Sequence, residues 1–415
     1  MKKRLFSLFL ALFLLLALTP PALAISQVEG PDTAAIARAI AEGVRRFEDI
    51  QELPGPFVRT AEELAEFVQA QVDARNEDFF FYITAPELLS KSRDALRSDF
   101  SFILFNYASG YDYRVETLSD QLIRVEVQQE LRPGLRMLDA WRAGDWSALS
   151  QREQEALAVA QAEVERILAE YTDPLEIERA IHDYVCLHLT YTTDDYRPPI
   201  TYFDTGYSVS VHHPDGEYCY NTATQALLAG EANCQGFTDV FYLMAGMAGF
   251  QVQNLSGWSQ DGSGSHIFNL IELDGGWYIV DCTNDDTDDR DMIYYFGFNA
   301  GQELYNHLIG WEPYYALVPI QETDRHFFYN SDSFASCSAS SLEELAAYTL
   351  DQLYGQGQER CQLLLEGWED EIGEGDFAAA FNAVLKRQSG PNTAWSYRYI
   401  ALGDDMFVTM YIRFA

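Results

Sequence analysis

The sequence predicts an α+β protein, with a central core of helices packed on an antiparallel sheet and a smaller α+β module on each side. Two observations predict the core. Apolar residues recur at helical spacing after Cys234, and the β-prone runs 266–273 and 276–282 flank Asp274-Gly275. A third observation predicts the modules, because helix-capping motifs and apolar strands occur on both sides of the core.

The first 24 residues have the composition of a secretory signal peptide. A basic start, Lys2-Lys3-Arg4, precedes the apolar run Leu5–Leu18, and Ala22-Leu23-Ala24 supplies small residues for cleavage. The apolar run is too short to span a bilayer, and no later segment is longer. We therefore expect a secreted, extracellular protein that has no membrane or lipid anchor.

Residues 25–146 are expected to form the N-terminal α+β module. Thr60 and Glu63 form a capping box before an amphipathic helix, and Thr84 and Glu87 form a second one. The module's other predicted elements are a helix at 33–49 and strands at 79–83, near 111–117 and at 121–130.

Residues 147–322 are expected to form the core, and residues 323–415 the C-terminal module. Ser150 and Glu153 cap a helix that runs to Tyr171, and Asp173-Pro174 starts the next helix. The C-terminal module repeats the plan of residues 60–130. Its predicted elements are a helix after Ser341, a strand at 361–365, a helix near 375–387, and strands at 397–399 and 407–414. A degenerate duplication would explain this repeat, although two ordinary α+β segments could also agree by chance.

Cys234 has the sequence context of a nucleophile. Asn233 is a good N-cap, so Cys234 falls in the first helical turn, where the helix macrodipole favours a thiolate. Gly249 is the expected end of this helix. A cysteine in an exported chain is more often half of a disulfide or a small core residue, so the rest of the site must support the assignment.

His266 and Asp281 supply a base and an orienting group. If Asp274-Gly275 forms the hairpin turn, both residues lie on one face as diagonal neighbours, within side-chain reach. A slip of one residue would put them on opposite faces. Cysteine, histidine and aspartate in this order suit acyl transfer through a covalent intermediate.

Several segments between Ile177 and Pro319 resemble the transglutaminase-like superfamily, the papain-fold group of cysteine acyl-transfer enzymes, in its secreted bacterial branch. The segments are Ala180–Tyr184, Leu189–Tyr191, Cys234–Phe237, His266–Asn269, Trp277–Thr283, Tyr294–Phe296 and Asn306-His307. The resemblance implies a papain-like core, with Cys234 as nucleophile, His266 as general base and then acid, and Asp281 holding the working tautomer of His266.

The chain also departs from the family pattern. Ala232 stands where the family commonly has glycine, and Asn284 stands where it often has tryptophan. A polar and aromatic insert at 193–220 occupies a region that is usually shorter in the family, so the substrate does not follow from the resemblance.

Two further roles rest on weaker patterns. The oxyanion donors are expected to be the backbone N–H of Cys234 together with Gln235 or Tyr191. His182-Asp183 lies mid-helix and is interpreted as structural, with its polar groups satisfied locally.

No cofactor is expected, because the chain shows no phosphate-binding loop, zinc spacing or dinucleotide fingerprint. An acidic run offers hard oxygen ligands for calcium but lacks the EF-hand glycine and glutamate, and solvated carboxylates are its simpler interpretation. The run consists of Asp285, Asp286, Asp288, Asp289 and Asp291.

The six cysteines are too few for a disulfide scaffold in a chain with 48% hydrophobic residues. They are Cys186, Cys219, Cys234, Cys282, Cys337 and Cys361. If Cys234 is free, at least one more is unpaired in a monomer. Cys337–Cys361 is one candidate disulfide, and Cys282 is interpreted as a buried structural residue.

The formal net charge of −37 argues against nucleic acid or anionic lipid as a partner. A protein or peptide substrate is expected, with cell-wall or extracellular proteins as partners. The predicted function is exported, cysteine-dependent acyl transfer on protein or peptide amides through a thioester. An amine acceptor gives cross-linking, whereas water gives an amidase or peptidase, and hydrolysis is favoured because no acceptor site is recognisable. The alternative is a catalytically silent cell-envelope or extracellular binding protein on the same scaffold.

Overall fold

The computed structural model covers the chain, and the residues that it describes fall in several ranges. These are 55–84, 104–119, 122–192, 221–259, 265–286, 293, 295–302, 305–306, 311–313, 316–321, 335–351, 360–365, 377–389, 394–402 and 405–413. The predicted signal peptide, the helix predicted at 33–49, Glu87 of the second capping box and the whole 193–220 insert lie outside these ranges.

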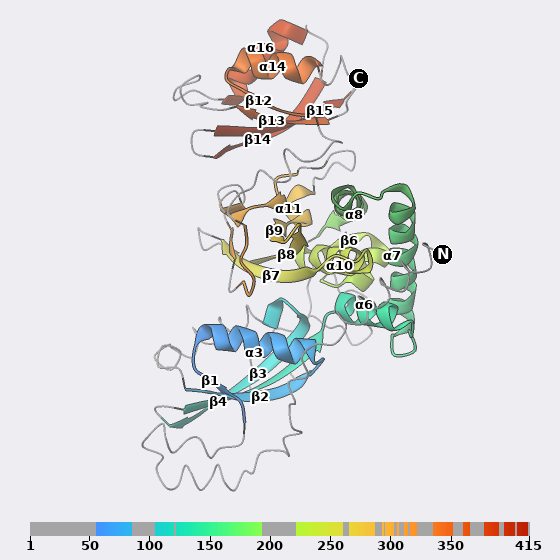
Figure 1. The fold of residues 1–415 in the computed structure, drawn as a ribbon, viewed down its shortest axis with the longest axis vertical. Helices are drawn as coiled ribbons and strands as arrows, with labels where there is room; N and C mark the ends of the chain where they lie inside the picture. Colours follow the sequence, from blue (N-terminus) through green and yellow to red (C-terminus); the bar gives the residue numbers. More distant parts are fainter. Residues whose placement is uncertain are drawn as a thin grey trace, which may run out of the picture.

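The N-terminal module is a four-stranded sheet with the order β1-β2-β4-β3 and one described helix packed on it (Figure 1). Its elements are β1 (Phe57–Val58), α3 (Ala61–Asp73), β2 (Asp78–Ile83), β3 (Ala108–Ser119) and β4 (Leu122–Leu131). Thr60 caps α3 by accepting from the N–H of Glu63 at 3.1 Å, as predicted. Leu64 and Val68 bury the inner face of α3 against Phe81 and Val125 of the sheet.

The central helix of the core is α10, which packs on a sheet on one side and on other helices elsewhere. The helices of this part are α6 (Pro133–Ala143), α7 (Gln151–Glu170), α8 (Pro174–His188), α9 (Ala223–Ala229) and α10 (Cys234–Met247). The predicted starts of α7 and α8 are confirmed, because Ser150 and Glu153 form a capping box and Asp173 caps α8 before Pro174. The helix α6 packs against α10, although it precedes the predicted domain boundary at 146.

The core sheet is antiparallel and has the order β10-β9-β8-β7-β11. Its strands are β7 (Val252–Ser259), β8 (Ser265–Leu273), β9 (Gly276–Val280), β10 (Phe298–Ala300) and β11 (Trp311–Pro313). A short parallel pair, β5 (Thr190–Tyr191) and β6 (Glu231–Ala232), lies before α10 in the chain. Helices on an antiparallel sheet confirm the predicted α+β core.

The hairpin of β8 and β9 has the predicted register. Asp274 and Gly275 have φ values of 51° and 83°, as a type I′ turn requires, and Leu273 lies opposite Gly276. However, β9 ends at Val280 and not at 282, because Asp281 becomes the N-cap of the short helix α11 (Cys282–Asp285).

The C-terminal module has a four-stranded sheet with the order β12-β13-β15-β14. Its elements are β12 (Ala335–Ala339), α14 (Leu342–Leu350), β13 (Arg360–Leu365), α16 (Phe377–Ser389), β14 (Ala394–Leu402) and β15 (Asp405–Arg413). In both modules the first strand pairs parallel with the second, and the last two pairings are antiparallel. This agreement is what a duplication requires, but the duplication itself stays a prediction.

The predicted Cys337–Cys361 disulfide also stays a prediction. The parallel pairing of β12 and β13 aligns Cys361 with Ala335, two residues before Cys337. No helix in the described part of the chain combines the length and the hydropathy needed to cross a membrane.

The N-terminal module is tied to the core by buried polar contacts at Asn106. Its side-chain oxygen accepts from the N–H of Ser256 at 2.7 Å, and its carbonyl accepts from Asn254 Nδ2 at 3.0 Å. The guanidinium of Arg132 bridges the same region, donating to Phe105 O at 2.6 Å and to Asn221 O at 3.3 Å. The module and the core therefore share a bonded interface.

Candidate active site

Cys234 is the first residue of α10 because Asn233 caps the helix from an extended conformation. Asn233 Oδ1 accepts from the N–H groups of Gln235 at 3.0 Å and Gly236 at 3.4 Å. The thiol therefore lies at the positive end of the helix macrodipole, which favours an anion. Cys186 and Cys282 are free but buried, whereas Cys234 is partly exposed. Among these three cysteines, Cys234 is the one that a substrate can reach.

The hairpin brings His266 and Asp281 into direct contact. His266 is 5% exposed near the start of β8, and its Nε2 lies 2.8 Å from Asp281 Oδ2. The thiol of Cys234 contacts the same imidazole. Because Nε2 faces the carboxylate, the other ring nitrogen, Nδ1, is the one available to the sulfur. The three predicted residues thus converge.

Asp281 is held by two side chains that the sequence did not single out for this role. Asn284 Nδ2 lies 2.6 Å from Asp281 Oδ2, and the hydroxyl of Tyr305 donates to the same oxygen at 2.9 Å. The other oxygen, Oδ1, accepts from the backbone N–H of Asn284 at 3.2 Å and so caps α11. Asn284 had appeared only as a departure from the family pattern. Tyr305 carried no local signal.

These contacts favour an ion pair between His266 and Asp281. Burial alone lowers the pKa of His266, but the charge and hydrogen bond of Asp281, together with Cys234, outweigh it and raise that pKa to about 10. Burial raises the pKa of Asp281, but His266, Asn284 and Tyr305 outweigh it, so the net shift is downward. The carboxylate and the imidazolium stabilise each other.

A hydroxyl joins the helix of Cys234 to the strand of His266. Thr238 Oγ1 lies 2.8 Å from Cys234 O and 3.0 Å from Ile267 O. Asn269 Nδ2 donates to Thr238 O at 3.1 Å, which adds a second bond between α10 and β8. The separation of the sulfur and the imidazole is therefore fixed by bonds between the elements that carry them.

The two oxyanion candidates lie near Cys234, and their roles stay predictions. The backbone N–H of Gln235 is engaged with Asn233, while its side chain is 6% exposed. Tyr191 lies in β5 beside Ala232 and is 44% exposed, with its ring 6.4 Å from that of Phe237.

Two interpretations of polar residues outside the candidate site were wrong. His182 was expected to be satisfied locally, but its Nε2 lies 3.1 Å from Oδ2 of Asp285, 103 residues away, while Asp183 Oδ1 is 3.5 Å from Nδ1. Asp285 was expected to be solvated within the acidic run. It is fully buried, and its carboxylate accepts from the N–H of Gly297. Of the run's other members, Asp288, Asp289 and Asp291 lie outside the described residues, and calcium binding stays untested.

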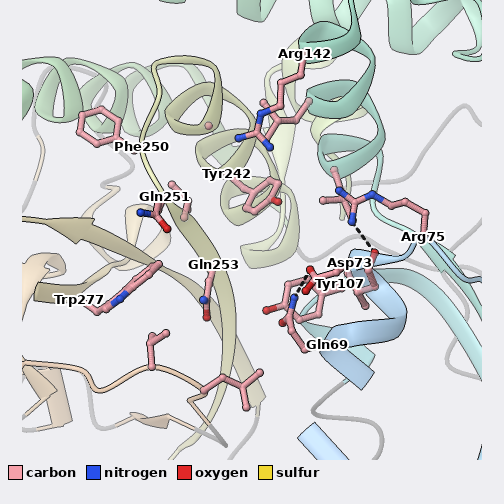
Figure 2. A pocket seen from close by; sticks show the side chains of 17 residues that line it. Gln69, Asp73, Arg75, Tyr107, Arg142, Tyr242, Phe250, Gln251, Gln253 and Trp277 are labelled. Carbon is pink, nitrogen blue, oxygen red and sulfur yellow. Dashed lines mark hydrogen bonds between the residues drawn. The ribbon is translucent and has the colours of Figure 1, made fainter. Parts of the chain in front are cut away.

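The cavity drawn in Figure 2 is separate from Cys234. It has a volume of about 500 Å³ and lies between α3 of the N-terminal module and the core, with Tyr242 and Trp277 on its wall. Tyr242 and Gly246 lie eight and twelve residues after Cys234 along α10, which corresponds to roughly 12–18 Å at the helical rise. This cavity therefore does not surround the thiol.

Comparison with known proteins agrees with the core fold. Residues 161–282 match the model of the transglutaminase-like superfamily. No curated protein matches the sequence.

Three solved structures are similar at 9–12% identity. A TGase is 12% identical over 70% of this chain and 70% of its own, with a TM-score of 0.28. A provisionally assigned cysteine protease from Cytophaga hutchinsonii is 9% identical over 49% of this chain and 65% of its own, with a TM-score of 0.26. LapG of Legionella pneumophila is 11% identical over 39% of this chain and 75% of its own, with a TM-score of 0.22. At these scores the likenesses carry no argument about function.

Proposed function

The chain contains a transglutaminase-like domain at residues 161–282, and on that premise we propose that it is a cysteine-dependent acyl-transfer enzyme. One arrangement carries the proposal. The partly exposed thiol of Cys234 contacts His266, and His266 is hydrogen-bonded to the buried carboxylate of Asp281 at 2.8 Å. A nucleophile, a base and an orienting group in contact are the minimum for this chemistry.

In the proposed reaction, the thiolate of Cys234 attacks the carbonyl carbon of an amide. The C–N bond breaks as His266 gives its proton to the leaving amine, and a thioester remains on the sulfur. Water or a second amine then loses a proton to His266 and attacks the thioester, which releases the thiolate. Asp281 holds the imidazole throughout and compensates its positive charge.

The proposed substrates are protein or peptide amides outside the cytoplasm, and hydrolysis is the favoured outcome. Two sequence features support these finer points: the signal-peptide composition of the first 24 residues, and the lack of a recognisable acceptor site. The 193–220 insert lies before α9 and outside the described residues, so we draw nothing about the substrate from it.

Selective alkylation tests whether Cys234 is the reactive thiol. Iodoacetamide at substoichiometric amounts, followed by peptide mapping of the folded, reduced protein, should label Cys234 at least about tenfold faster than the buried Cys186 and Cys282. In a His266→Gln variant this preference should shrink. Equal labelling of the three cysteines would contradict the proposal.

A second experiment separates the two outcomes of the reaction. The full chain is incubated with a primary-amine probe and a pool of glutamine-containing peptides, and Cys234→Ala serves as the control. Cleavage or deamidation of peptides indicates hydrolysis, whereas incorporation of the probe indicates transamidation. If the wild type and Cys234→Ala are indistinguishable, the enzymatic proposal fails and a binding protein on this scaffold is the remaining interpretation.

A further inference from the structure

A second cluster of reactive side chains lies between α8 and α11, and the proposed chemistry does not use it. His182 and Cys186 on α8 and Cys282 on α11 form the cluster, and Asp285 of α11 joins it through His182. All four are buried, between 0% and 3% exposed. Hydrogen bonds offset the cost of burying these groups: Cys186 Sγ donates to Cys282 O at 3.4 Å, and Asp285 Oδ2 lies 3.1 Å from His182 Nε2.

The spacing of the cluster suits a tetrahedral metal ion. His182 Nε2 lies 3.6 Å from Cys186 Sγ and 3.1 Å from Asp285 Oδ2. The ligand atoms of His182, Cys186 and Cys282 all lie within 4.8 Å of one another. Zinc bound tetrahedrally at about 2.0–2.3 Å holds its ligand atoms about 3.2–3.8 Å apart, so shifts of about 1 Å would bring His182, Cys186 and Cys282 to these separations. Asp285 Oδ2, beside His182 Nε2, would have to turn towards the two sulfur atoms to become the fourth ligand.

Hydrogen bonds from the surrounding residues orient His182 and Asp285. The second ring nitrogen of His182, Nδ1, faces Asp183 Oδ1 at 3.5 Å, and a metal-bound histidine usually donates this N–H to a carboxylate. Asp183 is fixed by Arg179 at 2.9 Å and by the hydroxyl of Tyr295 at 2.6 Å. Asp285 is fixed by the N–H of Gly297.

From this geometry we propose a structural site for one zinc ion, held by His182, Cys186, Cys282 and Asp285. Sulfur and nitrogen ligands select zinc over calcium or magnesium. Four protein ligands leave no open position, so the ion does not act on substrate. The sequence offered no zinc spacing because the ligands come as two pairs separated by almost a hundred residues.

The site would brace the candidate catalytic carboxylate. Cys282 directly follows Asp281, and Asp281 caps the helix that carries both Cys282 and Asp285. An ion bound between α8 and α11 would therefore fix the position of α11, and with it the position of Asp281. Two metal-free states compete with this proposal: a His182–Asp285 pair beside two thiols, and a Cys186–Cys282 disulfide.

Metal content and cobalt substitution test the proposal on the full chain. Protein purified under reducing conditions with added zinc should contain about one zinc per chain by mass spectrometry, which a structural site requires. Replacement by Co²⁺ should produce the near-ultraviolet absorption of thiolate-to-cobalt charge transfer. Cys282→Ala should hold less than about a tenth of the wild-type zinc. Cys234→Ser, a cysteine change outside the cluster, should keep all of it.

A milder variant keeps the test valid if loss of a ligand prevents folding. Asp183→Asn leaves all four ligands in place and should weaken zinc binding about tenfold, because it removes the carboxylate that faces His182 Nδ1. The far-ultraviolet circular dichroism of each variant shows whether it folds.

Two results would overturn the proposal. One is wild-type protein that binds no more zinc than folded Cys282→Ala. The other is a Cys186–Cys282 disulfide, mapped without reduction in protein that also lacks zinc after reduction and reloading. Both results are independent of acyl transfer, so the zinc site and the proposed function can fail separately.

Discussion

At the scale of single residues, the candidate site depends on the hydrogen bonds that the carboxylate of Asp281 accepts. One carboxylate receives His266, Asn284 and Tyr305 on Oδ2 and caps α11 with Oδ1. Such a carboxylate stays charged despite burial, because each contact favours the ionised form. The orientation of His266 then depends on donors that never meet the substrate.

The hydroxyl of Tyr305 is therefore expected to act as a positioning group. Tyr305→Phe removes one hydrogen bond to a charged oxygen, and we expect kcat to fall about tenfold with little change in KM. Tyr242→Phe makes the same chemical change at the distant cavity and should leave kcat near the wild-type value. Steady-state kinetics on the peptide substrate measure both. Equal effects in the two variants would contradict the role of Tyr305.

His266 is expected to remain protonated well above neutral pH, because its pKa is raised to about 10. Activity should then persist across neutral pH and decline as the pH approaches 10, where the proton donor for the leaving amine is lost. NMR titration of histidine-labelled protein, with the His266 signal identified from a His266→Gln sample, measures this pKa directly. In Asp281→Asn the pKa should fall well below about 10, because the main contribution that raises it is lost while burial still lowers it. Titration of wild-type His266 near 6.5 would contradict the ion pair.

The convergence of these residues was predictable only in part. Asn233 and the Asp274-Gly275 turn each give a local signal, and they place Cys234 and the hairpin correctly. The bond from Tyr305 to Asp281 spans 24 residues and depends on how β10 and the segment after it fold back. No spacing in the sequence encodes such a contact.

At the scale of secondary structure, capping residues explain which helix ends the sequence predicted correctly. Thr60, Ser150, Asp173 and Ser341 all accept from backbone N–H groups at the starts of their helices. The start of α11 was missed because the apolar alternation continues to Cys282, and only the side chain of Asp281 turns the chain into a helix. Local competition of this kind is hard to predict from pattern alone.

Glu153 joins two helices and predicts a pH-dependent stability. It accepts from the N–H of Ser150 at 2.9 Å and pairs with Arg136 of α6 at 2.7 Å. Burial raises the pKa of Glu153, but Arg136 and Ser150 outweigh it and lower the pKa overall. A carboxylate with a lowered pKa stabilises the fold above its unfolded-state pKa, and this contribution disappears as the pH falls through the folded value.

Glu153→Gln should therefore cost about 1 kcal/mol at pH 7, and the cost should be smaller at a pH of about 3, which lies below the ordinary pKa of 4.5. Denaturant unfolding at the two pH values measures the difference. Glu155→Gln, an exposed change in the same helix, should have little effect at either pH. A cost for Glu153→Gln that is equal at both pH values would show that the charge is unimportant.

At the scale of the whole molecule, the two flanking modules share a strand order, and buried hydrogen bonds join the N-terminal module to the core. The repeated capping motif and apolar strand, which are local features of the sequence, indicated that the two modules share a plan. The contacts of Asn106 with Asn254 and Ser256 span 148 and 150 residues, and no sequence pattern predicts them. The N-terminal module is bonded to the core sheet through these contacts.

We expect this interface to couple local unfolding of the N-terminal module to local unfolding of the core. Asn106→Ala leaves the N–H of Ser256 buried without its acceptor, which costs about 1–3 kcal/mol. Hydrogen exchange should then accelerate by about tenfold or more in both β2 and β7, because one opening event exposes both. Exchange in β13 of the C-terminal module should stay unchanged.

Asn76→Ala provides the matched control, because Asn76 Nδ2 bonds to Gln71 within the N-terminal module. Its effect should stay in that module and leave β7 protected. Exchange followed by mass spectrometry at single-peptide resolution distinguishes the two patterns. If Asn106→Ala accelerates exchange in β2 alone, the module opens independently and the buried bonds to Asn254 and Ser256 do not couple it to the core.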